Sequence, residues 1–207
     1  MRELKGNVRL KNGLANLVFG RLLIIRLSLF PLALSLPVSP ASAEPIPLHI
    51  KQIKSRHLNF ETTIQYITRT IERINRKTGA ELFLKSYEVI EDNLLSDVQR
   101  QDGKAIWKRI RELHNPGSGI TLFVLPHFRY KNKRFLNGLA YLKGNLSYVR
   151  VNFRAKRKSI CVMIHELLHN LGADHREEVR SVMYRYVNKY TRILQQTVKE
   201  VKGYLNL

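Results

Sequence analysis

The sequence predicts a single α+β domain behind an N-terminal export signal. Three observations lead to this fold class. Segments with strand-like and helix-like patterns alternate between residues 46 and 153. Residues 120–125, Ile-Thr-Leu-Phe-Val-Leu, form a nearly continuous apolar run of the kind found in a buried central strand. Residues 165–175 then place three histidines at helical and turn spacing, which predicts a metal-binding helix.

The N-terminal 43 residues are interpreted as a signal peptide. Basic residues dominate its start, and an apolar run at residues 27–38 leads to the small residues 41–43, Ala-Ser-Ala. The run is short for a membrane span. We therefore expect a secreted or periplasmic protein, with an uncleaved N-terminal membrane anchor as the alternative, and one domain over residues 44–207.

Secondary structure can be assigned in order along this domain. We expect strands at 46–53, 81–90, 120–125, 138–142 and 148–153, with helices at 59–77 and 104–114 and a C-terminal helix near the end. The first helix carries apolar residues three and four apart, with Asn59 as N-cap and Gly79 as its stop. The C-terminal helix is predicted from a similar spacing of Val187, Tyr190, Leu194, Val198 and Val201.

The residues from His165 to His175 follow the pattern H-E-x-x-H-x-x-G-x-x-H. His165 and His169 are four apart and share one helix face. Gly172 allows the chain to leave the helix, so that His175 can return as a third nitrogen ligand. Three protein ligands leave a fourth position open for water, which is the catalytic arrangement of zinc, and Glu166 is placed as the general base.

Downstream of the histidines, Ser181-Val182-Met183-Tyr184 follows at short spacing. With this second feature the chain resembles the metzincin clan of zinc endopeptidases, whose extended histidine motif is followed by a Met-turn. By resemblance Met183 is the Met-turn methionine beneath the metal, with Gly172 as the turn glycine of the motif near the metal. Tyr184 and Tyr186 make the turn look most like that of a minimal matrixin-like catalytic domain, and Arg185 stands where astacins and serralysins usually place a tyrosine.

The resemblance implies a twisted, mostly parallel sheet with an antiparallel edge strand, an active-site helix and a C-terminal helix. In that fold an extended peptide adds to the edge strand above the zinc. The matching candidates here are Leu139, Ala140, Tyr141 and Leu142. One catalytic zinc ion is expected. Calcium is not, because the sequence lacks the Asp/Gly-rich calcium loop of matrixins.

The charge of the chain bears on its partners. The formal net charge is +20, and residues 1–43 contribute six Lys and Arg and one Glu, so 30 basic and 15 acidic residues and a net +15 remain. Lys156, Arg157 and Lys158 precede the metal helix, where the helix dipole disfavours cations. We hypothesise that they direct acidic substrates to the cleft or hold the protein at an anionic envelope surface. A solvated loop is the alternative.

The leading function is that of an exported zinc endopeptidase, acting as a monomer on peptide or protein substrates. The alternative is a non-catalytic protein that binds zinc or a cell-surface envelope. Specific nucleic-acid binding is not expected, because aromatic residues are not interleaved with the basic ones.

Overall fold

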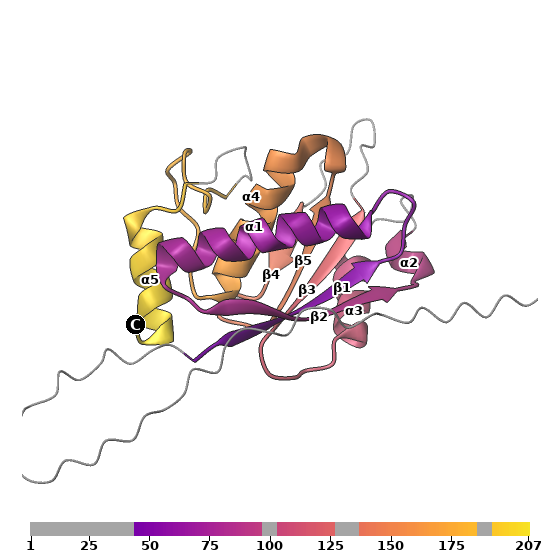
Figure 1. Ribbon diagram of the computed structural model, residues 1–207, viewed down its shortest axis with the longest axis horizontal. Helices are drawn as coiled ribbons and strands as arrows, with labels where there is room; N and C mark the ends of the chain where they lie inside the picture. The colour runs from indigo at the N-terminus through magenta and orange to yellow at the C-terminus, as the bar shows by residue number, and fades with distance from the viewer. Residues whose placement is uncertain (1–43, 97–102, 127–136, 186–191) are drawn as a thin grey trace, which may run out of the picture. The chain divides into compact units, whose positions relative to one another are not determined.

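The computed structural model describes residues 44–96, 103–126, 137–185 and 192–207 (Figure 1). The proposed signal peptide lies outside these residues, and so does Tyr186. None of the described helices is both long enough and apolar enough to cross a membrane.

A five-stranded sheet forms the centre of the domain, with the strand order β2-β1-β3-β5-β4. All neighbouring pairs are parallel except β4 and β5, which are antiparallel. The predicted fold class, with a mostly parallel sheet and an antiparallel edge strand, is thereby confirmed. The strands are β1 (Ile46–Ile53), β2 (Leu82–Ile90), β3 (Ile120–Pro126), β4 (Gly138–Ala140) and β5 (Leu146–Val151).

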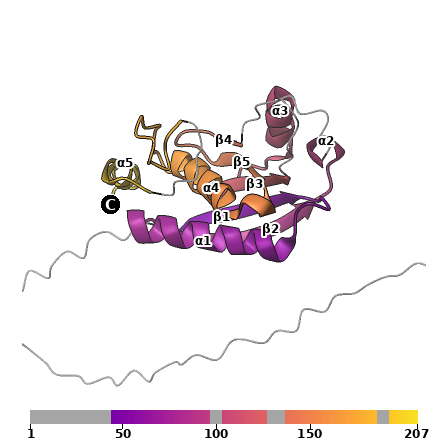
Figure 2. The ribbon, with the colours of Figure 1, turned by 90° about the horizontal axis from the view of Figure 1, so that it is seen from above.

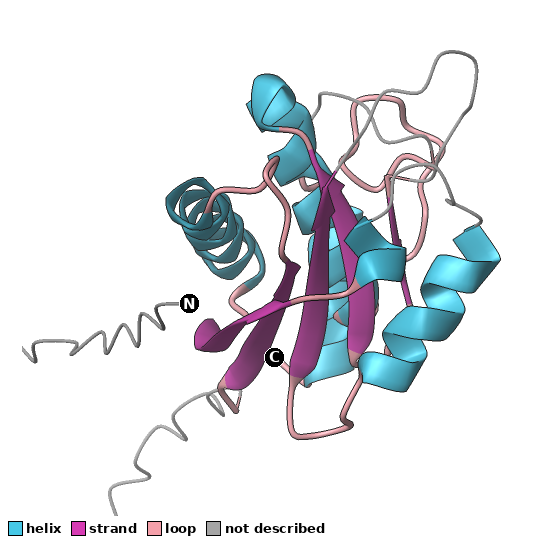
Figure 3. Cartoon of the chain, turned by 90° about the vertical axis from the view of Figure 1, so that its right-hand side faces the viewer, coloured by secondary structure: helices cyan, strands magenta, loops and turns pink. Residues whose placement is uncertain are grey.

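Helices lie on both sides of the sheet (Figure 3). Helices α1 and α4 pack against each other on one face, and α3 lies on the opposite face (Figure 2). The helices are α1 (Phe60–Thr78), α2 (Asn93–Ser96), α3 (Gly103–Leu113), α4 (Lys156–Asn170) and α5 (Gln195–Leu205), and a 3₁₀ turn, η1 (Phe153–Ala155), precedes α4.

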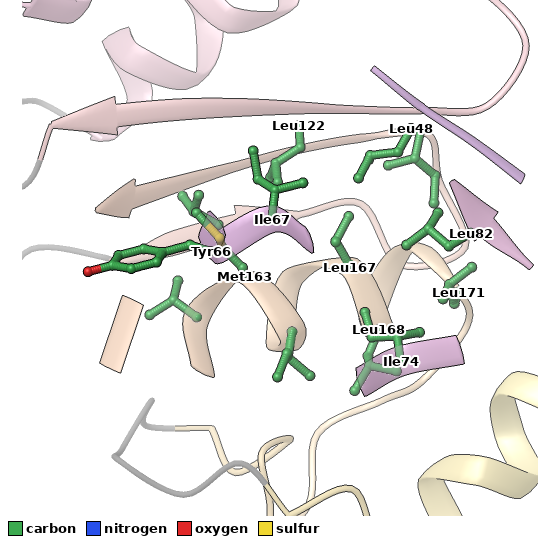
Figure 4. Close-up of a cluster of buried hydrophobic side chains, with 14 of the residues drawn as sticks. Leu48, Tyr66, Ile67, Ile74, Leu82, Leu122, Met163, Leu167, Leu168 and Leu171 are labelled. Atoms are coloured by element: carbon green, nitrogen blue, oxygen red, sulfur yellow. The ribbon is translucent and has the colours of Figure 1, made fainter. Parts of the chain in front are cut away.

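Two hydrophobic clusters hold these layers together, and β3 contributes to both. Leu122 belongs to the larger cluster with α1 and α4, whereas its neighbour Phe123 belongs to the smaller cluster with α3. Successive residues of a strand point to opposite faces, so a strand that is covered on both faces must be apolar throughout. Every residue of β3 is indeed buried. Figure 4 shows the larger cluster, in which Met163, Leu167 and Leu168 of α4 contribute side chains.

Helix α4 is enclosed on all sides for most of its length. All ten residues from Cys161 to Asn170 are buried. Burial of this kind needs an apolar sequence, and the polar exceptions in it are His165, Glu166, His169 and Asn170. Buried polar side chains need hydrogen-bond or metal partners, so these four residues are the candidates for a functional site on α4.

Four of the five predicted strands have different bounds in the structure. Two differ by one residue at one end, since β2 begins at Leu82 and β3 ends at Pro126, and the other two differ by two residues. The edge strand was expected to reach Leu142, but β4 ends at Ala140. A turn replaces its last two residues, because the N–H of Gly144 bonds to the carbonyl of Tyr141 and Lys143 adopts a left-handed conformation with φ 55°.

The strand expected at 148–153 begins and ends two residues earlier, as β5. Its end is set by Asn152, whose side-chain oxygen accepts a hydrogen bond from the N–H of Arg154 at 2.9 Å and starts the 3₁₀ turn. The predicted C-terminal helix is present as α5 from Gln195, and the first two residues of its pattern, Val187 and Tyr190, lie outside the described residues.

Candidate metal centre

Three histidine rings converge at the end of α4. His165 and His169 lie one turn apart, and their Nε2 atoms are 3.1 Å apart. The chain then turns at Gly172 and returns His175, whose Nε2 lies 3.2 Å from Nε2 of His169. Among the described residues these three form the one cluster of potential metal ligands, with their ligand atoms within 4.8 Å of one another. The structure therefore brings together the three ligands expected from the motif.

The tautomers of two of these rings follow from their hydrogen bonds. Nδ1 of His165 lies 2.7 Å from the carbonyl oxygen of Val182, and Nδ1 of His169 lies 2.8 Å from that of Ala173. A carbonyl can only accept, so both Nδ1 atoms carry the hydrogen and both Nε2 atoms present a lone pair. Two lone pairs 3.1 Å apart cannot bond to each other. A cation between them resolves the conflict, and the carbonyls are the usual outer partners of metal-bound histidines.

The spacing of the nitrogens fits a tetrahedral zinc ion. Zn–N bonds of about 2.05 Å in tetrahedral geometry separate two nitrogen ligands by about 3.3 Å. The two measured separations of 3.1 and 3.2 Å are close to this value. The residues present therefore fit zinc, with three nitrogen ligands.

Burial also prepares the rings to bind a metal. It lowers the pKa of His165 to about 4 and lowers that of His169 as well, and partial desolvation lowers the pKa of the more exposed His175. Histidines with such pKa values are neutral near pH 7, so a metal does not have to displace a proton from them.

Gly172 is required at the turn for two reasons. Its φ is +90°, a conformation that residues with a side chain rarely adopt. A β-carbon at this position would also lie 2.8 Å from Cβ of Tyr204 on α5. The close contact between the turn and α5 thus depends on glycine.

Helix α5 also holds the segment that carries His175. Glu200 forms an ion pair with Arg176 and accepts a weak hydrogen bond, 3.4 Å, from the N–H of Asp174. The N–H of Arg176 donates to the carbonyl of Met183 at 2.8 Å. His175 is itself exposed, so its position relies on these bonds to the residues on either side of it.

The predicted Met-turn is a tight turn that faces the histidines. Met183 is fully buried, and its N–H donates to Oγ of Ser181 at 3.0 Å. The preceding residue, Val182, supplies the carbonyl that bonds to His165, and its own N–H donates to the carbonyl of Arg192 at 2.8 Å. Tyr184 is partly buried at the end of the turn.

Glu166 lies on α4 beside the first ligand and is almost completely buried. Burial raises the pKa of its carboxyl group to about 8. The first residue of β4, Gly138, passes directly against it: a β-carbon on Gly138 would lie 2.5 Å from Oε1 of Glu166. The sequence did not single out Gly138 as a site residue, although it placed an edge strand there.

The edge strand lies next to the metal helix. The residues Gly138, Leu139 and Ala140 pair with β5, and in the described part of the sheet the opposite edge of β4 has no strand beside it. Asn170, at the end of α4, fixes the turn after β4: its Nδ2 donates to the carbonyls of Tyr141 at 3.1 Å and Leu146 at 3.3 Å. Leu142, like Tyr141, is exposed in this turn.

The basic residues Lys156, Arg157 and Lys158 form the first turn of α4 and are exposed. They do not share one surface. Arg157 lines a cavity between α1 and the segment before α5, whereas Lys158 lines a smaller one with Asn137 and Arg150.

The fold has a known counterpart. The structure is similar to the crystal structure of archaemetzincin from Methanopyrus kandleri, with a TM-score of 0.62 and 16% identity over 82% of this chain and 99% of that one. The chain thus shares the fold of that protein.

Two other crystal structures have lower TM-scores. Metalloproteinase-II from Bacteroides fragilis gives 0.49, at 12% identity over 79% of this chain and 54% of that one. A zinc-dependent peptidase from Methanocorpusculum labreanum gives 0.45, at 14% identity over 74% and 99%. No protein-family model and no curated protein matches the sequence.

Several residues that build the site were not identified from the sequence. The carbonyls of Ala173 and Val182 carry no sequence signal, because every residue has a carbonyl. Asn170 and Glu200 are polar residues whose partners lie 24 to 29 positions away. For Asn170 a signal was available, since a buried amide directly after the second histidine needs partners.

Proposed function

We propose that this protein is an exported zinc endopeptidase that hydrolyses peptide bonds. The observation that carries the proposal is the convergence of three neutral imidazoles, two of them with defined Nε2 lone pairs, next to a buried glutamate. The fold shared with an archaemetzincin agrees with the metzincin resemblance of the sequence. His165, His169 and His175 would hold one zinc ion.

When bound, zinc supplies a Lewis acid and lowers the pKa of water towards about 7. The protein supplies the proton transfers. The carboxylate of Glu166 takes a proton from the water that attacks the scissile carbonyl, and then delivers it to the leaving amine nitrogen. Burial raises the pKa of this carboxyl group to about 8 in the metal-free protein, and the positive charge of a bound zinc ion would favour the carboxylate form that the first step needs.

The peptide is proposed to bind as an added strand on the free edge of β4. Main-chain groups of Leu139 and Ala140 would pair with it, and the exposed side chains of Tyr141 and Leu142 would flank it at the turn. An extended backbone on this edge lies beside Glu166, because Gly138 at the start of β4 contacts that side chain. An edge that accepts any extended chain favours cleavage within a peptide over removal of terminal residues.

The deciding experiment measures hydrolysis of a peptide library by the zinc-loaded protein, with and without a chelator. Cleavage is expected at internal bonds, and the chelator should abolish it. Glu166→Gln should keep its zinc and lose activity. Glu72→Gln, an exposed glutamate on α1, is the matched control and should be fully active. Zinc binding without hydrolysis by the unchanged protein would instead support the non-catalytic alternative.

Export and the preference for anionic partners are further parts of the proposal. Export rests on the predicted signal at residues 1–43, and is tested by whether the mature protein begins at Glu44 outside the cytoplasm. A preference for acidic substrates rests on the net positive charge. Reversing the charges of Lys156, Arg157 and Lys158 together should then weaken cleavage of acidic peptides more than that of neutral ones.

A further inference from the structure

A cavity of about 410 Å³ lies at the N-terminal end of α4, between α1 and the segment that leads into α5. Its lining comes from three parts of the chain that are distant in sequence. Four of the seven lining residues are cationic: Arg73, Lys77, Arg157 and Arg192. The others are Ile193, Leu194 and Gln195, so none of the described residues that line the cavity is acidic.

These four cations also lack acidic partners elsewhere. Within the described parts of the chain, none of them takes part in an ion pair. Other cations do find partners, as Arg109 does with Asp92. Like charges that surround one cavity without counter-charges repel each other, and an anion between them removes that repulsion.

Arg73 shows this lack of compensation most directly. Its Nε is buried and has no hydrogen-bond partner among the residues that the structure describes. Burial, together with the nearby charges of Arg76 and Arg157, lowers the pKa of its guanidinium group. A buried donor without an acceptor costs free energy. An anion bound in the cavity would accept a hydrogen bond from this N–H group and would lower that cost.

The rest of the lining also suits an anion that carries an organic group. Helix α5 starts at Gln195, and its N-cap, Leu194, has no side-chain oxygen to accept the first N–H groups. These donors and the positive end of the helix dipole add to the field of the four cations. Ile193 and Leu194 supply an apolar wall, and the volume is within the range of small-molecule sites.

We propose that this cavity binds a phosphate-bearing anion. Three guanidinium groups present paired N–H donors that match phosphate oxygens, and Lys77 adds a point charge. The cavity is distinct from the metal centre, because Arg157 and His165 are eight residues apart on α4, or about 12 Å along its axis. The ligand is either a soluble phosphate compound or the headgroup of an anionic phospholipid, and both would present the same chemistry here.

Two measurements test the proposal. Isothermal titration calorimetry measures the binding of inorganic pyrophosphate to the full chain. Sedimentation measures its binding to phosphatidylcholine vesicles that contain or lack phosphatidic acid. The double variant Arg157→Glu/Arg192→Glu reverses two exposed cations of the cavity. The control, Lys85→Glu/Lys108→Glu, makes the same change in net charge at exposed positions on β2 and α3. Neither measurement uses peptide hydrolysis, so the result does not depend on the proposed peptidase activity.

We expect saturable binding that the cavity variant weakens at least about tenfold and the control leaves within about twofold. Binding of pyrophosphate with this pattern identifies a soluble ligand, and binding confined to phosphatidic acid vesicles identifies a lipid headgroup. Equal weakening in both variants would mean a diffuse basic surface and would overturn the proposal. So would the absence of saturable binding to either probe.

Discussion

Gly138 and Glu166 are in such close contact that the first residue of the edge strand leaves no room for a side chain. A β-carbon on Gly138 would lie 2.5 Å from Oε1 of Glu166 and 2.7 Å from its Cγ. The backbone of β4 therefore forms one wall of the space occupied by the proposed general base. The strand that is proposed to bind substrate and the residue proposed to move the proton are positioned against each other.

Gly138→Ala should consequently displace the carboxylate of Glu166. Because the three atoms nearest to this β-carbon position all belong to Glu166, we expect zinc binding to be retained while kcat for peptide hydrolysis falls by about tenfold or more. Zinc content and steady-state kinetics measure the two effects. Gly103→Ala is the control, since a β-carbon there meets nothing within 4 Å. Equal activity of the two variants would show that Glu166 adjusts without cost.

Gly172→Ala is expected to affect the metal site through the backbone. Alanine at φ +90° is strained by about 1–3 kcal/mol, and its β-carbon also meets Tyr204. The turn that returns His175 would shift, so zinc affinity should fall together with the stability of the metal-free protein. Competition with a fluorescent chelator and denaturant unfolding measure these quantities.

Gly203→Ala serves as the control for this change. Gly203 lies on α5, and a β-carbon there meets nothing within 4 Å. Alanine in a helix is favoured over glycine by about 0.5–1 kcal/mol, so this variant should be slightly more stable. If Gly172→Ala matched it in stability and zinc affinity, the turn would not need glycine.

The sequence predicted best those features that repeat at a fixed spacing. The strand at 46–53 was located to the residue, and in the structure it pairs with β2 along its whole length and with β3 from Leu48 to Gln52. The metal helix was predicted because the spacing of His165, His169 and His175 directly reflects helix and turn geometry. Strand ends were less predictable: Tyr141 and Asn152 end strands through single hydrogen bonds that a pattern of hydrophobicity does not contain.

Individual contacts between distant segments were not predicted from the pattern of residues. Gly138 meets Glu166 only after β4 has paired with β5 and α4 has packed on the sheet. Arg73, Arg157 and Arg192 are scattered along the chain, and only packing of α1 against α4 brings the first two to one cavity. The basic run before the metal helix was noticed, but the sequence did not show that Arg157 and Lys158 point to different cavities.

Asn170→Ala should weaken the connection between α4 and the turn after β4. The variant removes two hydrogen bonds, a buried one to the carbonyl of Leu146 and a partly buried one to that of Tyr141, which together typically cost about 1–3 kcal/mol. Because Asn170 does not bind the histidines, we expect the peptide KM to rise while zinc affinity stays near its original value. Denaturant unfolding and kinetics test this, with the exposed Asn93→Ala as control. A large loss of zinc with an unchanged KM would place the role of Asn170 at the metal instead.

The stability of the metal-free protein should depend on pH through Glu166. Its pKa is raised from 4.5 to about 8 in the folded protein, so between these values the folded state holds a proton that the unfolded state has released. The stabilisation from the protonated carboxyl is complete below about pH 4.5 and is lost as the pH rises through about 8. The loss can reach about 1.4 kcal/mol per pH unit.

Glu166→Gln removes this titration, because an amide stays neutral throughout. The measurement is the free energy of unfolding of both proteins in the presence of a chelator. The value for Glu166→Gln minus the value for the unchanged protein should grow as the pH rises from about 5 to about 7.5. His165, whose pKa is lowered to about 4, acts in the opposite direction, since its contribution is lost as the pH falls from 6.5 towards 4. It is present in both proteins and cancels in the difference. A difference that stays constant over this range would mean that Glu166 titrates as an ordinary exposed carboxyl group, and its burial would then not tune it for proton transfer.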